Sequence, residues 1–132
     1  MEAENMAALV VESTALIQYL RGEENTLLEL GLEAMALQLP PLVYTELMGN
    51  PIHAKERASI EQLFQKIPLC EVDRGHFERS AKLKAALEAR GMHLSARDAH
   101  IVQCALDQDA LLLTKDPFFA ELTKYCGVKV QL

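Results

Sequence analysis

Residues 110–116 read ALLLTKD, a short apolar run that ends at a threonine, a lysine and an acidic residue. An apolar run of this length, bounded by polar residues, predicts a strand that is buried on both faces. Residues 7–12 read AALVVE and end in the same way, at Glu12. Strands of this kind are typical of a parallel sheet that helices cover on each side. In such a sheet, residues just past the carboxyl ends of the strands converge on one crevice.

Helical patterns fill most of the chain around these two strands. Strands that alternate with helices predict an α/β fold of three α/β/α layers, with a parallel sheet of about four to five strands. Because there is no internal repeat or linker, we expect a single domain over residues 1–132. The expected helices cover residues 15–20, 24–31, 41–48, 54–66, 75–90, 96–107 and 117–124, and the further strands cover 34–39, 69–72 and 128–130.

The composition is that of an ordinary globular protein, with 50% hydrophobic and 24% charged residues. No apolar run approaches the ~20 residues that span a bilayer, and the acidic N-terminus lacks the basic start of a signal peptide. The three cysteines, Cys70, Cys104 and Cys126, are an odd number and form no C-x-x-C pair. They predict buried free thiols in a reducing cytoplasm.

The net charge of −6 argues against tight, non-specific binding of nucleic acid, which depends on Lys and Arg. It does not exclude a nuclease, because a bound divalent metal would offset part of the charge at the site. An acidic surface also suits a basic protein partner.

Four acidic residues stand at the edges of predicted elements: Glu12, Glu46, Asp98 and Asp116. Three of them also have a purely structural explanation. Ser95 and Asp98 have the spacing of a capping box, Asp116 precedes a proline as an N-cap does, and Glu12 could be a solvated strand end. Ser13 or Thr14 would then cap the first helix. For each acid taken alone, this explanation accounts for the sequence as well as a functional one.

Glu46 is harder to explain structurally. It lies in the last turn of its helix, where the helix dipole disfavours a negative charge. It follows Leu42 and Val43 at i−4 and i−3, so we expect its side chain to face inward. An inward carboxylate without a basic neighbour in sequence needs a partner in space.

If the four carboxylates meet, they cannot all stay ionised cheaply, because like charges a few Å apart raise each other's pKa. A divalent cation removes this conflict, and a set of oxygen ligands without Cys or His suits Mg²⁺ or Mn²⁺. Thr114 would point to the same side as Asp116 and could orient a carboxylate or a water. The pattern therefore indicates metal-assisted phosphodiester chemistry.

With these motifs the chain resembles the PIN-domain ribonucleases, most closely the single-domain VapC-type toxins of toxin–antitoxin pairs, nearly from end to end. The resemblance implies a PIN-like fold and an endoribonuclease that uses Mg²⁺ or Mn²⁺ in the cytoplasm. It also implies an RNA substrate, an antitoxin partner and a homodimer. The matching segments are VVESTALI at 10–17, YTEL at 44–47, GMHLSARDA at 91–99 and LLTKD at 112–116, which implies Glu12, Glu46, Asp98 and Asp116 as metal ligands and, with Thr114, as the catalytic residues.

The chain departs from this family at its first acid, where Glu12 replaces the usual Asp. The extra methylene can displace the ion, because Mg²⁺ demands near-ideal octahedral geometry. The alternative function is therefore a catalytically weakened PIN module that binds RNA or a protein without cleavage. A receiver-like signalling domain is a third reading, but it expects adjacent acids after the first strand, where this chain has Val11 and Glu12.

The basic residues near the acids leave two readings open. Arg97 and Lys115 each precede a predicted site acid, so they are either clamps for a substrate phosphate or solvated charges at the rim. The histidines form no pair with zinc spacing, and we expect surface or interface roles for them. They are His53, His76, His93 and His100.

Overall fold

The structure, a computed structural model, describes residues 6–50 and 54–132. Its sheet has four parallel strands in the order β2-β1-β3-β4. The two central strands pair with each other from Leu9 opposite Leu111 to Val11 opposite Leu113. Glu12 and Thr114 therefore leave the sheet side by side. The strands are β1 (Leu9–Val11), β2 (Leu37–Gln38), β3 (Leu111–Leu113) and β4 (Lys129–Gln131).

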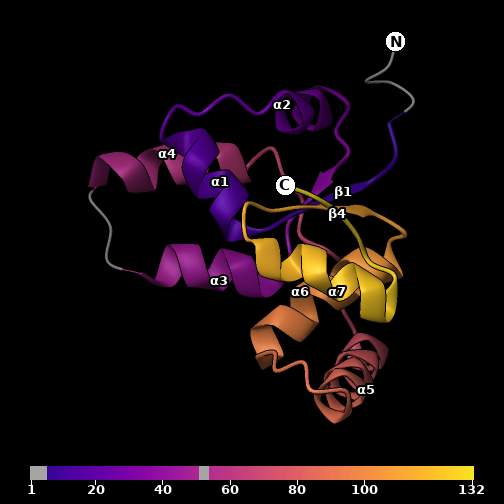
Figure 1. Cartoon of the computed structure of the whole chain (residues 1–132). Helices are drawn as coiled ribbons and strands as arrows, with labels where there is room; N and C mark the ends of the chain where they lie inside the picture. Colours follow the sequence, from indigo (N-terminus) through magenta and orange to yellow (C-terminus); the bar gives the residue numbers. More distant parts are fainter. Residues whose placement is uncertain (1–5, 51–53) are drawn as a thin grey trace.

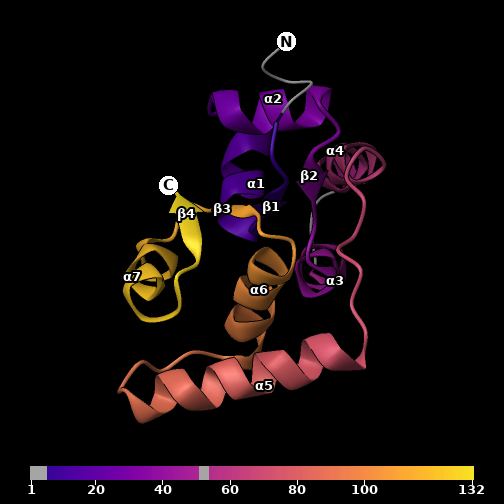
Figure 2. The ribbon, with the colours of Figure 1, turned by 90° about the vertical axis from the view of Figure 1, so that its right-hand side faces the viewer.

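Helices cover both faces of the sheet, which confirms the predicted three-layer α/β/α fold (Figures 1 and 2). In Figure 2, α1 and α2 lie above the sheet, α3, α6 and α7 lie below it, and α5 crosses beneath α6. Each helix begins and ends within two residues of the predicted range. The helices are α1 (Ser13–Leu20), α2 (Thr26–Glu33), α3 (Pro41–Gly49), α4 (Ala54–Phe64), α5 (Arg74–Ala89), α6 (Ala96–Asp107) and α7 (Pro117–Cys126).

The strand predicted at residues 69–72 is wrong. This segment makes only an isolated parallel bridge, between Leu69 and Leu39. Hydrogen bonds reach Leu39 from both sides, since its N–H donates to Pro68 and its carbonyl accepts from Cys70. Asp73 then caps α5, so too few residues remain between the bridge and the helix to extend the pairing.

The core lies on both sides of the central strands. Val10, Val11 and Leu112 are fully buried, as expected for strands between two helical layers. Gly31 of α2 packs directly on the sheet, because a Cβ there would lie 2.8 Å from methyl carbons of Leu9 and Leu37.

The thiols of Cys70 and Cys104 are free and buried, as predicted, whereas Cys126 is free but only half-buried. Hydrogen bonding to Cys70 and burial raise the pKa of the Cys104 thiol. Across the described residues, every helix is too short or too polar to cross a membrane.

Candidate functional site

Glu12 is buried at the carboxyl end of β1 and is the N-cap of α1. It therefore is not a solvated strand end, and the cap predicted at Ser13 or Thr14 lies one or two residues too late. Its Oε1 accepts from the hydroxyls of Thr14 and Thr114, the latter at 2.6 Å, and from the Thr14 N–H at 3.2 Å. Its Oε2 accepts from the Ser13 hydroxyl at 2.7 Å.

The hydrogen bonds to Glu12 decide its charge. Burial by itself would raise the pKa of this carboxyl, but the bonds from Thr114, Thr14, Ser13 and Arg97 outweigh burial and lower the pKa. Glu12 is therefore a carboxylate, held ionised mainly by neutral hydroxyls.

Arg97 of α6 points into the acids rather than away from them. Its Nη2 donates to Glu12 Oε2 at 2.9 Å, to the Ser13 hydroxyl at 2.7 Å and to Glu46 Oε1 at 3.0 Å. Its Nη1 donates to Asp98 Oδ1 at 3.0 Å. Its Nε lies 2.9 Å from Glu46 Oε2, but the N–H is not aligned for a hydrogen bond, so this contact is an ion pair only.

Glu46 thus has the predicted partner in space, although its side chain is 35% exposed and Leu42 one turn before it is also exposed. That partner, Arg97, lies 51 residues away in sequence. Asp98 is both part of the helix cap and a partner of Arg97. Its Oδ1 pairs with Arg97, and its Oδ2 completes the predicted capping box by accepting from the Ser95 N–H at 3.4 Å.

Asp116 joins this group through Thr114. The Asp116 N–H donates to the Thr114 hydroxyl at 3.0 Å, and the same hydroxyl donates to Glu12. The carboxylate of Asp116 accepts from the Phe118 N–H at 3.0 Å and caps α7, with Pro117 in the first turn, as predicted.

The Arg97 side chain, 28% exposed, is not a solvated rim charge. Burial would lower the pKa of its guanidinium, but the hydrogen bonds from Arg97 to Glu46 and Glu12 outweigh burial and raise the pKa. One guanidinium faces three carboxylates, so the group keeps a negative excess. We call Glu12, Glu46, Asp98 and Arg97 the acidic centre.

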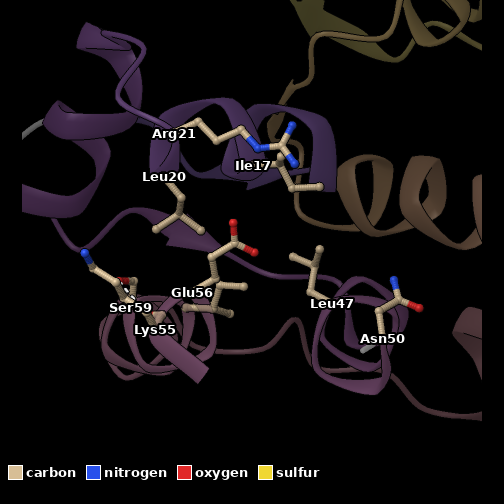
Figure 3. A pocket seen from close by; sticks show the side chains of 9 residues that line it. Ile17, Leu20, Arg21, Leu47, Asn50, Lys55, Glu56 and Ser59 are labelled. Atoms are coloured by element: carbon tan, nitrogen blue, oxygen red, sulfur yellow. Dashed lines mark hydrogen bonds between the residues drawn. The ribbon is translucent and has the colours of Figure 1, made fainter. Parts of the chain in front are cut away.

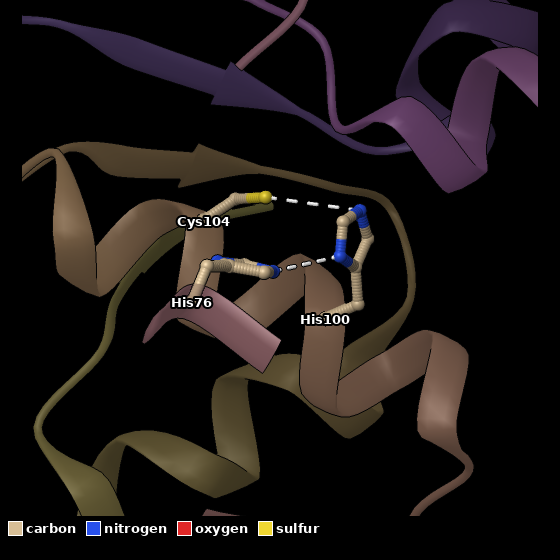
Figure 4. Close-up of side chains that lie close together, drawn as sticks. All are labelled: His76, His100 and Cys104. Atoms are coloured by element: carbon tan, nitrogen blue, oxygen red, sulfur yellow. Dashed lines mark hydrogen bonds between the residues drawn. The ribbon is translucent and has the colours of Figure 1, made fainter. Parts of the chain in front are cut away.

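A second polar network lies beneath the sheet and contains two of the four histidines (Figure 4). His76 Nδ1 lies 3.0 Å from Asp107 Oδ2, and His76 Nε2 lies 2.8 Å from His100 Nδ1. His100 Nε2 accepts from the Leu42 N–H at 3.4 Å and lies 3.8 Å from Cys104 Sγ. Both rings are 1% exposed.

The surface or interface role predicted for the histidines is therefore wrong for His76 and His100. The His93 side chain is 84% exposed and pairs with Glu88, and His53 lies outside the described residues.

The network is a complete hydrogen-bond relay. In the tautomers that satisfy every contact, His76 Nδ1–H donates to Asp107, His100 Nδ1–H donates to His76 Nε2, and the Leu42 N–H donates to His100 Nε2. His76, His100 and Cys104 are the one trio of His, Cys or acidic side chains in the described ranges whose ligand atoms lie within 4.8 Å of one another. Because their nitrogens already partner each other, we interpret them as a link between α5, α6 and the start of α3. The latter two helices carry Asp98 and Glu46.

The pKa values of two groups in this network, His100 and Asp107, are lowered. Burial, followed by the charge of His76, lowers the pKa of His100 to about 4. Burial would raise the pKa of Asp107, but hydrogen bonds from Arg79, Gln103 and His76 lower it to about 2.

A cavity of about 300 Å³ opens between α1, the end of α3 and α4 (Figure 3). None of the four predicted site acids lines it, so the hollow is separate from the acidic centre. Its lining mixes apolar side chains with a few charged ones: Ile17, Leu20, Arg21, Leu47, Asn50, Lys55, Glu56, Ser59 and Ile60.

Comparison with known families identifies the fold. The PIN domain model matches residues 9–125. This chain belongs to the PIN domain family. A comparison with curated proteins gave no match.

Several solved structures share the PIN fold over nearly their whole length. VapBC2 from Rickettsia felis, bound to a DNA fragment from its promoter, has a TM-score of 0.79 at 13% identity, over 94% of this chain and 97% of that one. DNA-bound VapBC from Salmonella typhimurium has a TM-score of 0.79 at 13% identity, with coverages of 96% and 98%. VapBC-5 from Mycobacterium tuberculosis, of a family of toxin–antitoxin systems, has a TM-score of 0.70 at 19% identity, with coverages of 95% and 98%.

Proposed function

We propose that this PIN domain is a metal-dependent endoribonuclease and the toxin of a toxin–antitoxin pair. One observation carries the proposal. Glu12, Glu46 and Asp98 come from three distant segments and meet around one cation, the Arg97 guanidinium. The meeting point lies just past the end of β1, in the crevice where parallel α/β sheets bind their ligands.

The donor set fits a hard divalent cation. Every acid of the centre offers carboxylate oxygens, and the place between them already accommodates positive charge. Glu12, Glu46, Asp98 and Asp116 would hold Mg²⁺ or Mn²⁺, which would lower the pKa of a water and stabilise charge on the phosphate. In the protein itself, Thr114 holds the Glu12 carboxylate and Ser95 holds that of Asp98.

Cleavage of labelled RNA with MgCl₂ or MnCl₂, against EDTA, tests the proposal. We expect metal-dependent products from the unaltered chain and a loss of at least about 100-fold in Glu46→Gln and Asp116→Asn, each of which removes a ligand charge. Asn caps helices as well as Asp does, so the second variant keeps α7. Asp109→Asn is the matched control, because the Asp109 side chain is 96% exposed. Equal activity in all four proteins would refute the proposed site.

A second candidate function is a PIN module that binds RNA or protein without cutting. The observation that favours it is the saturation of Glu12, whose two oxygens already receive bonds from three hydroxyls, one N–H and Arg97. Under this reading RNA binds but stays intact with either metal. The same assay, read together with a gel-shift measurement, separates the two functions.

The partner that we propose is an antitoxin, because the similar solved structures include members of toxin–antitoxin complexes. We place its contact at the cavity between α1, α3 and α4, where Leu20 and Leu47 offer apolar surface. Leu20→Glu should then abolish co-purification with the product of the neighbouring reading frame. We further propose a homodimer acting on cytoplasmic RNA, and analytical ultracentrifugation measures the dimer directly.

A further inference from the structure

The Arg97 guanidinium fills the position that the acids surround. All three of its nitrogens lie within 3.0 Å of a carboxylate oxygen, and those oxygens belong to Glu12, Glu46 and Asp98. A bound Mg²⁺ holds its ligand oxygens at about 2.0–2.1 Å in an octahedral arrangement. Two cations cannot use the same few oxygens in this way, because the guanidinium blocks the approach and like charges repel.

We propose that Arg97 is an internal counter-cation that competes with the divalent metal, so that the metal binds only when this side chain swings out of the acidic centre. The inference rests on the proposed metal site and adds its regulation. Without metal, Arg97 offsets the repulsion among three carboxylates. With metal, the guanidinium is released toward solvent or a substrate phosphate.

We assign this exchange to the Arg97 side chain alone, with the backbone of α6 in place. The residue lies in the first turn of α6, whose start is fixed by the bonds between Ser95 and Asp98. The Arg97 side chain is 28% exposed, so part of it already faces solvent. The hydroxyls of Ser13, Thr14 and Thr114 stay on Glu12 when Arg97 leaves, so the carboxylate keeps its position.

The exchange has a quantitative consequence for metal affinity. A ligand that binds only one conformer has an apparent dissociation constant raised by the inverse of that conformer's population. If Arg97 is out in about one molecule in ten, removing its charge tightens metal binding about tenfold. Because the acids then lack a counter-ion, the same change lowers the metal-free melting temperature and enlarges the gain that metal gives.

The test is calorimetric titration of MnCl₂ into the full chain and into Arg97→Gln, with melting curves of each at several Mn²⁺ concentrations. Arg74→Gln is the matched control, since it removes one positive charge from an exposed ion pair on α5. We expect binding at least about tenfold tighter in Arg97→Gln than in the other two proteins. Arg97→Lys should fall between them, because a lysine point charge cannot span three carboxylates.

The outcomes separate this inference from the proposed nuclease function. Equal Mn²⁺ affinity in Arg97→Gln and Arg74→Gln, including no binding by either, overturns the inference. Tighter binding in Arg97→Gln supports it, even if neither protein cleaves RNA, in which case the nuclease proposal fails alone. If Arg97→Gln is unfolded without metal, the comparison of Arg97→Lys with Arg74→Gln decides by the same criterion.

Discussion

Helix α6 carries residues of two polar networks, one half-buried and one buried. Arg97 and Asp98 belong to the acidic centre, and His100 belongs to the relay that ends at Asp107. The first network keeps several charges close together, while the second holds its two rings in a chain of single proton donors and acceptors. The two networks therefore respond differently to acid.

We predict that His100 makes the fold sensitive to mild acid. The pKa of His100 is about 4 in the folded chain and 6.5 when the side chain is free. Between these two pH values His100 is protonated in the unfolded state but neutral in the folded state. The contribution of His100 to the unfolding free energy is fully present above about pH 6.5 and is lost as the pH falls toward 4. The unfolding free energy lost between pH 7 and pH 5 is about 2 kcal/mol.

Urea unfolding at pH 7, 6 and 5 measures this dependence. His100→Gln should flatten the slope of unfolding free energy against pH, whereas His93→Gln, which alters an exposed ring, should retain it. A slope that persists in His100→Gln would assign the effect to another group.

That these acids come near one another could be predicted from the sequence, but the cation between them could not. Glu12 and Asp116 follow apolar strands, and Glu46 lies one turn after the buried Val43, so their general direction follows from periodicity. The direction of Arg97 depends on how α6 is rotated over the sheet, and no local pattern encodes that rotation. A useful signal was present nonetheless, since Glu46 required a cation that its own segment lacks.

At the scale of elements, α2 packs closely on the sheet because Gly31 has no side chain. We predict that Gly31→Ala destabilises the protein, because its new methyl group would meet the buried Leu9 and Leu37 at 2.8 Å. Gly49→Ala is the control, since the corresponding position at the end of α3 has no neighbouring atom within 4 Å. Both changes gain helix propensity, so their difference in unfolding free energy, about 1–3 kcal/mol, isolates the overpacking. Equal unfolding free energies in the two variants would show that α2 moves to accommodate the new methyl group without loss of stability.

Sequence patterns predict the central strands better than the edge strands. The central strands are buried on both faces, so they appear in the sequence as continuous apolar runs. At the sheet edges this signal fades. Residues 69–72 read LCEV and are more apolar than the edge strand β4, KVQ at 129–131, yet only the latter pairs along its length. The difference lies in the distance to the next helix, which composition does not encode.

For the whole molecule, the cysteines offer a probe of global unfolding. We predict that iodoacetamide modifies Cys126 first, because it alone is half-buried, while Cys70 and Cys104 react only as the chain unfolds. The raised pKa of Cys104 slows its reaction further, since the thiolate is the reactive form. Mass spectrometry at increasing urea should show both core thiols labelled along the same transition as circular dichroism. Rapid labelling of Cys104 in native buffer would contradict the buried core.

The pairing of β1 with β3 also has a consequence for biosynthesis. Glu12 leaves the ribosome early, but Arg97 and Thr114, which hold its carboxylate, follow 85 and 102 residues later. A nascent chain that has not yet exposed α6 and β3 contains the first acid without its counter-ion, its hydroxyl partner or Asp98. The acidic centre can therefore assemble only once α6 and β3 have emerged, and a product truncated before α6 lacks both Arg97 and Asp98.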